Sequence, residues 1–249
     1  MQHRPVTILF SLLCIAATGC KRETPVSPAP QTGATVNATP VIDGYRALWD
    51  QVDQQQLILT AHVYPNRAAL EFDDMTPPGE RERLVAFLLA SQPVLQGVIE
   101  QSRLTPEPFP PEPSLDEGAG LNAHMQRPRA WFQNFARLLS ADASRCWEAG
   151  DATGAAERVA ATIRLGNAMC GQPDELNHLV GAGFVGSAAQ KAVALFDAGL
   201  VQKATPDSLN ELRDAAAASM AGSMAFGADA TRQINAALQT IHDRLSDGG

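Results

Sequence analysis

The sequence has few aromatic residues, few cysteines and little positive charge. Aromatic residues make up 6% of the chain, while alanine is abundant. This composition favours closely packed helices over a β-sandwich. The 19 Lys and Arg residues are outnumbered by 27 Asp and Glu residues, which gives a net charge of −8. Because nucleic acids bind basic surfaces, we expect no nucleic-acid partner.

The chain also lacks the residue patterns of common catalytic and metal sites. No G-x-S-x-G nucleophile elbow is present. Four of the five histidines, His62, His124, His178 and His242, are scattered over separate predicted elements. Asp174 lies one helical turn before His178, but no third ligand accompanies them, so we interpret them as a surface pair. The sequence therefore predicts no catalytic residue, no metal and no cofactor.

The first 20 residues have the features of a bacterial export signal. A basic start, Met1–Arg4, precedes an apolar run, Val6–Ala17, that is too short for the roughly 20 residues of a membrane span. The run ends in Ala17-Thr18-Gly19-Cys20, which resembles the lipobox of bacterial lipoproteins, with Ala17 where leucine is commoner. The resemblance implies cleavage before Cys20 and lipid on Cys20, which would anchor the protein to a membrane. The alternative is ordinary secretion with Cys20 unmodified.

The next segment reads as a tether. Lys21–Pro40 is rich in Pro, Thr, Ala and Ser, a composition typical of disorder, and its reach is roughly 25 Å. A ligand for a proline-binding module is the alternative. Lys21 replaces the Asp that is linked to inner-membrane retention, so we expect the outer membrane, with the protein facing the periplasm of the cell envelope. The predicted organisation is a signal peptide over 1–19, a lipidated and tethered segment over 20–41, and an all-α domain over 42–249.

Three consecutive helices organise the folded part. Apolar spacing predicts a helix over Arg129–Ala149, a turn at Gly150-Asp151, a second helix running through Met169, and a third over Glu175–Asp197. So short a turn forces the first two helices to pack antiparallel. On the first helix, the polar residues expected on the face away from the apolar stripe are Arg137, Asp142, Ser144, Arg145 and Glu148.

A glycine-rich motif lies inside the third predicted helix. Gly181–Gly186 matches G-x-G-x-x-G, the dinucleotide-binding pattern. That mechanism needs a strand before the motif and an acidic residue about 20 positions later, and the sequence offers neither. We therefore interpret the motif as small residues where two helices cross closely. Leu176 and Leu179 are expected on the same buried face.

The remaining elements complete an all-α helical bundle of six or seven helices. Asp43 is predicted to cap the first helix. Leu57–Tyr64 either continues this helix or forms a short strand. Thr76-Pro77-Pro78 begins a helix that Pro93 should kink. Two further helices follow Thr205-Pro206.

The segment between Thr105 and Pro128 is expected to be irregular. It carries five prolines before Pro128 and the acids Glu107, Glu112, Asp116 and Glu117. A loop of this length within a domain is uncommon and is often functional, so its acids and prolines either face a partner or cover a pocket. The alternative is a solvated connector across one end of the bundle.

Two cysteines remain once Cys14 and Cys20 are assigned to the signal and the lipid. In the predicted hairpin Cys146 lies opposite about Ala156, so Cys170 is displaced by 14 residues, or about 21 Å along the helix. A disulfide needs Cα atoms within about 7 Å. We therefore predict that Cys146 and Cys170 are unpaired.

The middle of the chain resembles a helical family abundant in planctomycete-type bacteria, many of whose members are exported. The resemblance covers about Ser91 to Asp197, implies an all-α fold and carries no assigned activity. Glu148-Ala149-Gly150-Asp151, with Ala155, also resembles the turn of a tetratricopeptide repeat (TPR), which makes the hairpins TPR-like. The matching residues are Phe135-Ala136-Arg137-Leu138-Leu139, Asp142-Ala143, Gly150-Asp151, Ala155-Ala156, Leu165-Gly166-Asn167-Ala168, Leu179-Val180-Gly181 and Ala188.

Two functional hypotheses follow. The first is a lipid-anchored envelope domain that binds an unknown protein partner or supports structure, and an exposed apolar or acidic patch beside the proline-rich loop would favour it. The second is an envelope enzyme or small-molecule-binding protein with a site between helices, which a pocket with at least two buried polar groups would favour. Met220, Met224 and Phe226 either line an apolar groove or pack in the core.

Overall fold

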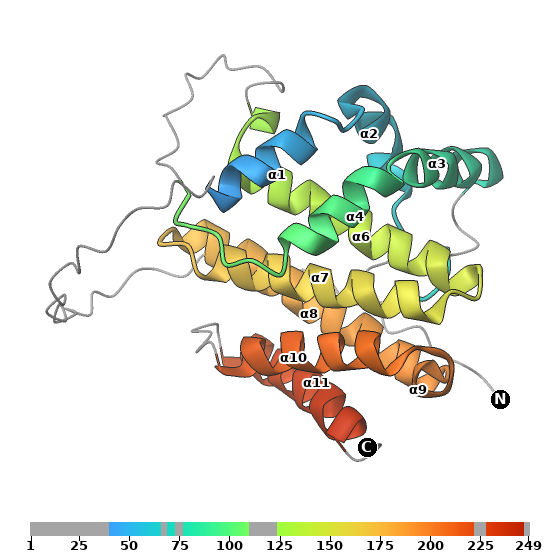
Figure 1. Ribbon diagram of the computed structural model, residues 1–249, viewed down its shortest axis with the longest axis vertical. Helices are drawn as coiled ribbons and strands as arrows, with labels where there is room; N and C mark the ends of the chain where they lie inside the picture. Colours follow the sequence, from blue (N-terminus) through green and yellow to red (C-terminus); the bar gives the residue numbers. More distant parts are fainter. Residues whose placement is uncertain (1–39, 66–68, 73–76, 110–123, 222–227, 247–249) are drawn as a thin grey trace, which may run out of the picture. The chain divides into compact units, whose positions relative to one another are not determined.

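The chain is helical wherever the structure describes a regular element. The computed structural model describes residues 40–65, 69–72, 77–109, 124–221 and 228–246, all of which belong to one unit, Thr39–Gly249 (Figure 1). The predicted signal peptide, Cys20 and the tether up to residue 39 lie outside the described residues. In chain order the elements are α1 (Val41–Trp49), α2 (Gln54–Thr60), the 3₁₀ helix η1 (Ala61–Val63), α3 (Pro78–Ala90), α4 (Gln92–Gln101), α6 (Pro128–Glu148), α7 (Ala152–Cys170), α8 (Glu175–Asp197), α9 (Leu200–Lys203), α10 (Pro206–Ala221) and α11 (Ala228–Ser246).

The prediction of an all-α fold is confirmed, but the predicted number of helices is wrong. The described ranges hold ten α-helices and no strand. Pro93 lies in the first turn of α4, and α3 and α4 are separate helices that meet at 61° rather than one kinked helix. In one continuous helix Pro93 would have no amide hydrogen for the Leu89 carbonyl, and its ring would clash with that carbonyl, which explains the break at Ser91.

The TPR-like detail is also wrong. A tetratricopeptide repeat pairs two helices of similar length in a 34-residue unit. The described helices range from the 4 residues of α9 to the 23 residues of α8, and no such unit recurs among them.

The helical hairpin of α6 and α7 forms as its turn residues predict. Gly150 has a φ of +79°, a left-handed conformation that glycine adopts without steric cost. The Asp151 carboxylate accepts a hydrogen bond of 2.8 Å from the Gly154 amide and so caps α7. The helix α7 packs against α6, α8 and α10. Figure 1 shows α1–α4 on one side of the α6–α7 hairpin and α10–α11 on the other.

The beginning of the bundle differs from prediction. The helix α1 starts at Val41, with Pro40 at its N-cap, so Asp43 lies in the first turn and does not cap the helix. The cap comes from Glu107, whose carboxylate accepts from the Val41 amide at 3.0 Å. Leu57–Tyr64 is no strand, because α2 and η1 continue through it as far as Val63.

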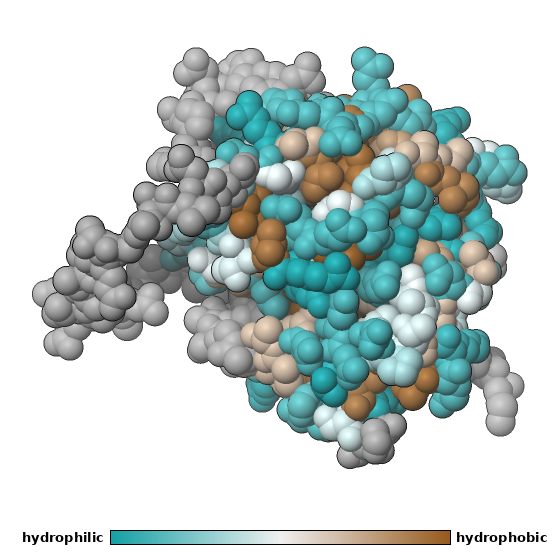
Figure 2. Space-filling model, viewed as in Figure 1, coloured by the Kyte–Doolittle hydropathy of each residue, from teal (hydrophilic) through white to brown (hydrophobic). Residues whose placement is uncertain are grey.

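The interior divides into two apolar clusters of different composition. The first lies among α1–α4, α6 and the adjoining parts of α7 and α8, and it holds most of the buried aromatic rings. The Tyr45 and Phe132 ring centroids lie 4.5 Å apart there, and those of Trp49 and Phe135 lie 5.7 Å apart. The second cluster, among α6–α8, α10 and α11, is rich in alanine. Small side chains let these helices approach closely, as the composition predicts. On the face drawn in Figure 2, hydrophilic residues surround smaller apolar areas.

The helices α7 and α8 cross at two glycines, so the structural interpretation of the glycine motif is confirmed. A Cβ atom on Gly181 would lie 2.5 Å from the Gly166 carbonyl oxygen, and one on Gly166 would lie 2.8 Å from the Gly181 carbonyl oxygen. The prediction that Leu176 and Leu179 lie on the buried face of α8 is wrong, because these side chains are 49% and 64% exposed. Gly181 and Val185 face α7 instead, since the close crossing sets the rotation of α8.

By length and composition, α8 is one helix that could cross a membrane, and the bent pair of α3 and α4 passes the same test together. Within the bundle, 61% of the α8 window is buried. That burial fits the central helix of a packed domain.

Candidate functional site

The structure does not describe all of the residues that the sequence analysis names as candidates. Cys20, Met224 and Phe226 fall outside the described residues. Met220 is partly buried and packs against the alanine-rich cluster.

In the structure, the carboxylate of Asp174 caps a helix and forms an ion pair, as expected for a surface residue. Asp174 caps α8 by accepting from the Leu176 amide, and it pairs with Arg129 at 3.3 Å. His62 lies 3.0 Å from Glu80 at the surface. Among the described residues, no group of three or more His, Cys, Asp and Glu side chains is placed to hold a metal ion.

Cys146 and Cys170 are free, as predicted. Burial raises the pKa of the Cys146 thiol to about 12 and that of Cys170 to about 11. Because the thiolate is the nucleophile, burial disfavours nucleophilic attack by either side chain.

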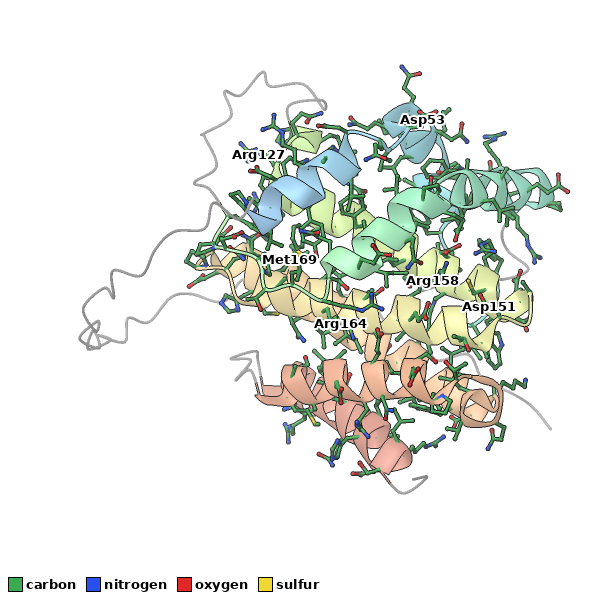
Figure 3. The ribbon with its side chains drawn as sticks, viewed as in Figure 1. Asp53, Arg127, Asp151, Arg158, Arg164 and Met169 are labelled. Atoms are coloured by element: carbon green, nitrogen blue, oxygen red, sulfur yellow. The ribbon has the colours of Figure 1, made fainter. Side chains whose placement is uncertain are left out.

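A buried polar network replaces part of the predicted polar face of α6. Asp142 is fully buried and receives hydrogen bonds from Arg145, Arg158 and Gln92. Arg158 also donates to the Gln92 side chain at 2.9 Å. Figure 3 places Arg158 between Asp151 and Arg164 along α7. The prediction that Asp142 and Ser144 lie on the polar outer face is wrong, because α4, α7 and α8 supply partners that the sequence of α6 does not contain.

Ser144 and Lys191 form a second buried polar contact, between α6 and α8. The Lys191 Nζ atom donates to the Ser144 Oγ atom and to the Ser140 carbonyl oxygen, each at 2.7 Å. The Ser144–Lys191 distance matches that of a nucleophile and its base. Both side chains are buried, however, and the Ala69 carbonyl lies 3.3 Å from Ser144. A substrate has no access, so we interpret the contact as a tie between helices.

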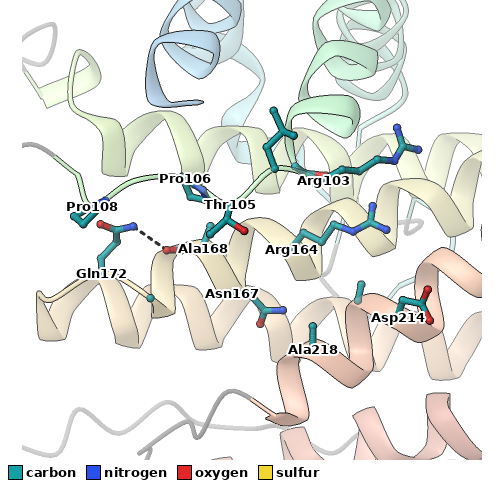
Figure 4. Close-up of a pocket in the computed structure, with 14 residues that line it drawn as sticks. Arg103, Thr105, Pro106, Pro108, Arg164, Asn167, Ala168, Gln172, Asp214 and Ala218 are labelled. Atoms are coloured by element: carbon teal, nitrogen blue, oxygen red, sulfur yellow. Dashed lines mark hydrogen bonds between the residues drawn. The ribbon is translucent and has the colours of Figure 1, made fainter. Parts of the chain in front are cut away.

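A pocket of about 450 Å³ lies between α7, α10 and the segment that follows α4 (Figure 4). This volume falls within the range of small-molecule sites. The first residues of the predicted Thr105–Pro128 loop form one wall, and residues 110–123 of that loop lie outside the description. The lining residues are Ser102, Arg103, Leu104, Thr105, Pro106, Pro108, Arg164, Asn167, Ala168, Gly171, Gln172, Asp214, Ala215 and Ala218.

One wall of the pocket is fixed by hydrogen bonds at Glu107 and Phe109. Glu107 caps α1, and backbone hydrogen bonds including that from Val41 lower the pKa of its carboxyl. Gln172, which is almost fully buried, accepts from the Phe109 amide at 2.6 Å and donates to the Ala168 carbonyl at 3.1 Å. These contacts hold Pro106 and Pro108 over α7.

Two arginines lie together in the pocket, and their guanidinium groups point to the same side (Figure 4). Both bind Glu211: Arg103 at 2.8 Å, and Arg164 at 3.2 and 3.3 Å through its two terminal nitrogens. Arg164 also donates to the Glu211 carbonyl oxygen at 3.3 Å. Although partial burial opposes ionisation, the two arginines hold the pKa of Glu211 below its usual range. Asp214 has its own cation, Arg213, at 3.2 Å.

Several polar groups of the pocket are held in place by hydrogen bonds to their neighbours. Its described lining combines apolar side chains with hydroxyls, amides, two guanidinium groups and the Asp214 carboxylate. The hydroxyl of Ser102 donates to the Ile99 carbonyl at 2.7 Å, within its own helix turn. Asn167 is tied to Ser219 at 2.7 Å. Fixed polar groups beside an apolar floor can orient a ligand.

Two of the buried charged residues, Arg158 and Lys191, have a signal in the sequence. Arg158 lies on the same helical face as Ala155 and Ala161, and Lys191 lies between Gln190 and Ala192 on an alanine-rich face. A charged side chain on the apolar face of a helix needs a buried partner. The partners themselves, and the pocket, depend on tertiary packing.

Comparison with protein-family models, with curated proteins and with solved structures finds no match for this chain.

Proposed function

We propose that this protein is a lipid-anchored, α-helical protein of the cell envelope that binds a small molecule in the pocket between α7, α10 and residues 102–108. The pocket is the observation that carries the proposal. It meets the criterion set for the second hypothesis from sequence, because Gln172 and Arg164 are largely buried polar groups in its lining. The enzymatic variant of that hypothesis gains no support, since no nucleophile and base meet in the described lining.

The envelope assignment rests on the sequence. The export signal, the lipobox ending at Cys20 and the proline-rich tether support an anchored protein on the outer membrane, facing the periplasm. The resemblance of Ser91–Asp197 to an exported planctomycete-type family is part of the same proposal. Metabolic labelling with a palmitate analogue tests it. We expect label on the wild-type chain and none on Cys20→Ala, and label on both would contradict lipidation at Cys20.

Native mass spectrometry of the full chain tests ligand binding. The protein is purified in mild detergent from its own envelope, and we expect a small-molecule mass to accompany it. Ala218 lines the pocket and is exposed, so Ala218→Trp should fill the pocket without disturbing the core and should abolish that mass. Ala47 is exposed on α1, away from the lining residues, and Ala47→Trp serves as the matched control. The proposal fails if the wild type carries no ligand or if Ala218→Trp retains it.

Protein binding is the second candidate, and one observation favours it. Leu104, at the start of the proline-rich segment, is 51% exposed. An apolar side chain exposed at this point can contact a partner protein. Cross-linking in the native envelope tests this role. It predicts a stoichiometric partner that is lost when Thr105–Pro128 is deleted or when Leu104→Ser is introduced, and recovery of the protein alone would contradict it.

A further inference from the structure

The charges around the pocket do not balance. Arg103, Arg164 and Glu211 form one connected group of two cations and one anion. Asp214 does not compensate, because it is paired with Arg213 and is 68% exposed. The group therefore has a net charge of +1 in a chain whose net charge is −8. An isolated positive site in an acidic protein is not part of a general basic surface.

The two arginines are held with different strengths. The side chain of Arg164 is 17% exposed and reaches Glu211 through three contacts, one of them to the backbone. Arg103 is 39% exposed and is held through one terminal nitrogen. Solvent-exposed ion pairs of this kind contribute only about 0.2–1 kcal/mol, so Arg103 can exchange Glu211 for a ligand anion at little cost.

Away from the guanidinium groups the pocket is lined mainly by prolines and an alanine, with the amide of Gln172 at its far end (Figure 4). In Figure 4, Pro106 and Pro108 lie above Ala168 and Gln172, while Arg103, Arg164 and Asp214 occupy the other end. A ligand with an anionic head and a short apolar body would match both ends. Guanidinium groups bind carboxylates through paired N–H donors.

From this geometry we infer that the pocket binds a small carboxylate, with Arg103 moving from Glu211 to the ligand and Arg164 remaining in place. This inference rests on the proposed ligand-binding function and specifies its chemical class. Glu211 is then a competitor for the ligand carboxylate.

Hexanoate, 1-hexanol and hexylamine are matched probes that differ only at the head group. Their binding to the full chain is measured by titration calorimetry and by chemical-shift changes of the pocket amides. We expect hexanoate to bind at least about tenfold more tightly than either of the others, as one charge-assisted hydrogen bond would give. Equal binding of all three would overturn the carboxylate inference and leave the ligand-binding function standing. If hexanoate leaves the pocket amides unperturbed, the inference fails, and native mass spectrometry still decides whether the pocket binds another ligand.

Three variants separate the roles of the charges. Arg103→Gln should weaken hexanoate binding about tenfold. Arg83 is exposed on α3 and is not a lining residue, so Arg83→Gln should change hexanoate binding less than about twofold. Glu211→Gln removes the competitor and should tighten hexanoate binding several-fold. If Arg103 and Glu211 only stabilised the fold, their substitutions would not change hexanoate affinity in opposite directions. Weaker binding by Glu211→Gln, or unchanged binding by Arg103→Gln, would overturn the inference.

Discussion

The Nζ atom of Lys191 lies 2.7 Å from the Oγ atom of Ser144, and both side chains are buried between α6 and α8. Burial lowers the pKa of Lys191 from its ordinary value of 10.5 to about 7. A neutral amine still has two N–H donors, one for Ser144 and one for the Ser140 carbonyl. The lysine can therefore keep both hydrogen bonds without its charge.

This lysine should make the stability of the protein depend on pH. Between about pH 7 and 10.5 the unfolded chain binds the Lys191 proton and the folded chain does not, so the free energy of unfolding rises with pH. Below pH 7 both states are protonated and the full cost of the buried charge is present. The slope that one group can supply is at most about 1.4 kcal/mol per pH unit.

Urea unfolding of Lys191→Met at a series of pH values measures this effect. Relative to the wild type, the variant should gain stability near pH 6 and lose that advantage towards pH 10. Lys203 is the matched control, since it lies at the surface over the ring of Trp147, 4.7 Å from the ring centroid. The free energy of unfolding of Lys203→Met should change with pH in the same way as that of the wild type. If the unfolding free energy of Lys191→Met also follows that of the wild type at every pH, the pKa of Lys191 is not lowered in the folded protein.

The crossing of α7 and α8 should not tolerate a single added methyl group. In Gly181→Ala the new Cβ would lie 2.5 Å from the Gly166 carbonyl oxygen and 2.8 Å from the Cys170 amide nitrogen, both backbone atoms that cannot turn aside. We expect a loss of about 1–3 kcal/mol of unfolding free energy. Gly79, in the first turn of α3, has open space around its Cβ position.

Gly79→Ala is therefore the control for the same chemical change. It should leave the protein as stable as the wild type or stabilise it by about 0.4–1 kcal/mol, because alanine restricts the unfolded chain. Chemical denaturation of the two variants measures the difference. Equal stability of Gly79→Ala and Gly181→Ala would show that the two helices can separate at no cost.

The helices α6–α8 could be predicted from sequence because their boundaries are set by local chemistry. Gly150 and Asp151 end one helix and begin the next, and Asp174 caps α8 through the Leu176 amide. None of these signals depends on distant residues. The apolar spacing of α6 also identified Phe132, Phe135 and Leu139, all of which are buried.

The parts that could not be predicted depend on segments far apart in the chain. Glu107 caps a helix that begins 66 residues earlier, and Gln92 completes the surroundings of Asp142 from 50 residues away. The pocket likewise needs three segments to meet. A pattern that describes one helix cannot identify a partner on another. The spacing within α6 therefore predicts the wrong face for Asp142, and the sequence around Glu107 does not indicate that this residue caps α1.

The two free cysteines should react slowly with alkylating reagents in the folded protein. The pKa of Cys170 is about 11, compared with an ordinary value of 9.0. The thiolate fraction at pH 8 is then roughly 100-fold below that of an unperturbed thiol, and the rate of alkylation should fall with it. Mass spectrometry after a timed iodoacetamide pulse measures the rate, with the urea-unfolded chain as reference. Rapid native labelling of Cys146 would contradict its burial, and a Cys146–Cys170 disulfide would contradict the helical hairpin.

Removal of the Asp142 carboxylate should destabilise the folded protein more than most single substitutions in the bundle. It is fully buried and bonded to Arg145, Arg158 and Gln92, so its loss leaves two guanidinium groups close together without their anion. Breaking a buried pair by removing one partner typically costs about 3–5 kcal/mol. We expect Asp142→Ala to lose stability on that scale in urea unfolding, and Asp142→Asn to lose less because it keeps a hydrogen-bond acceptor.

Asp243 supplies the control, since it is exposed on α11 and accepts a hydrogen bond from Gln239 at 2.7 Å. Asp243→Ala should change the unfolding free energy by less than about 0.5 kcal/mol. The double variant Asp142→Leu with Arg158→Met separates charge from packing. If the network serves mainly to avoid an unpaired charge, this variant should recover much of the stability that Asp142→Ala loses. No recovery would indicate that the hydrogen bonds to Gln92 and Arg145 position α4 against α6 in a way that apolar packing cannot replace.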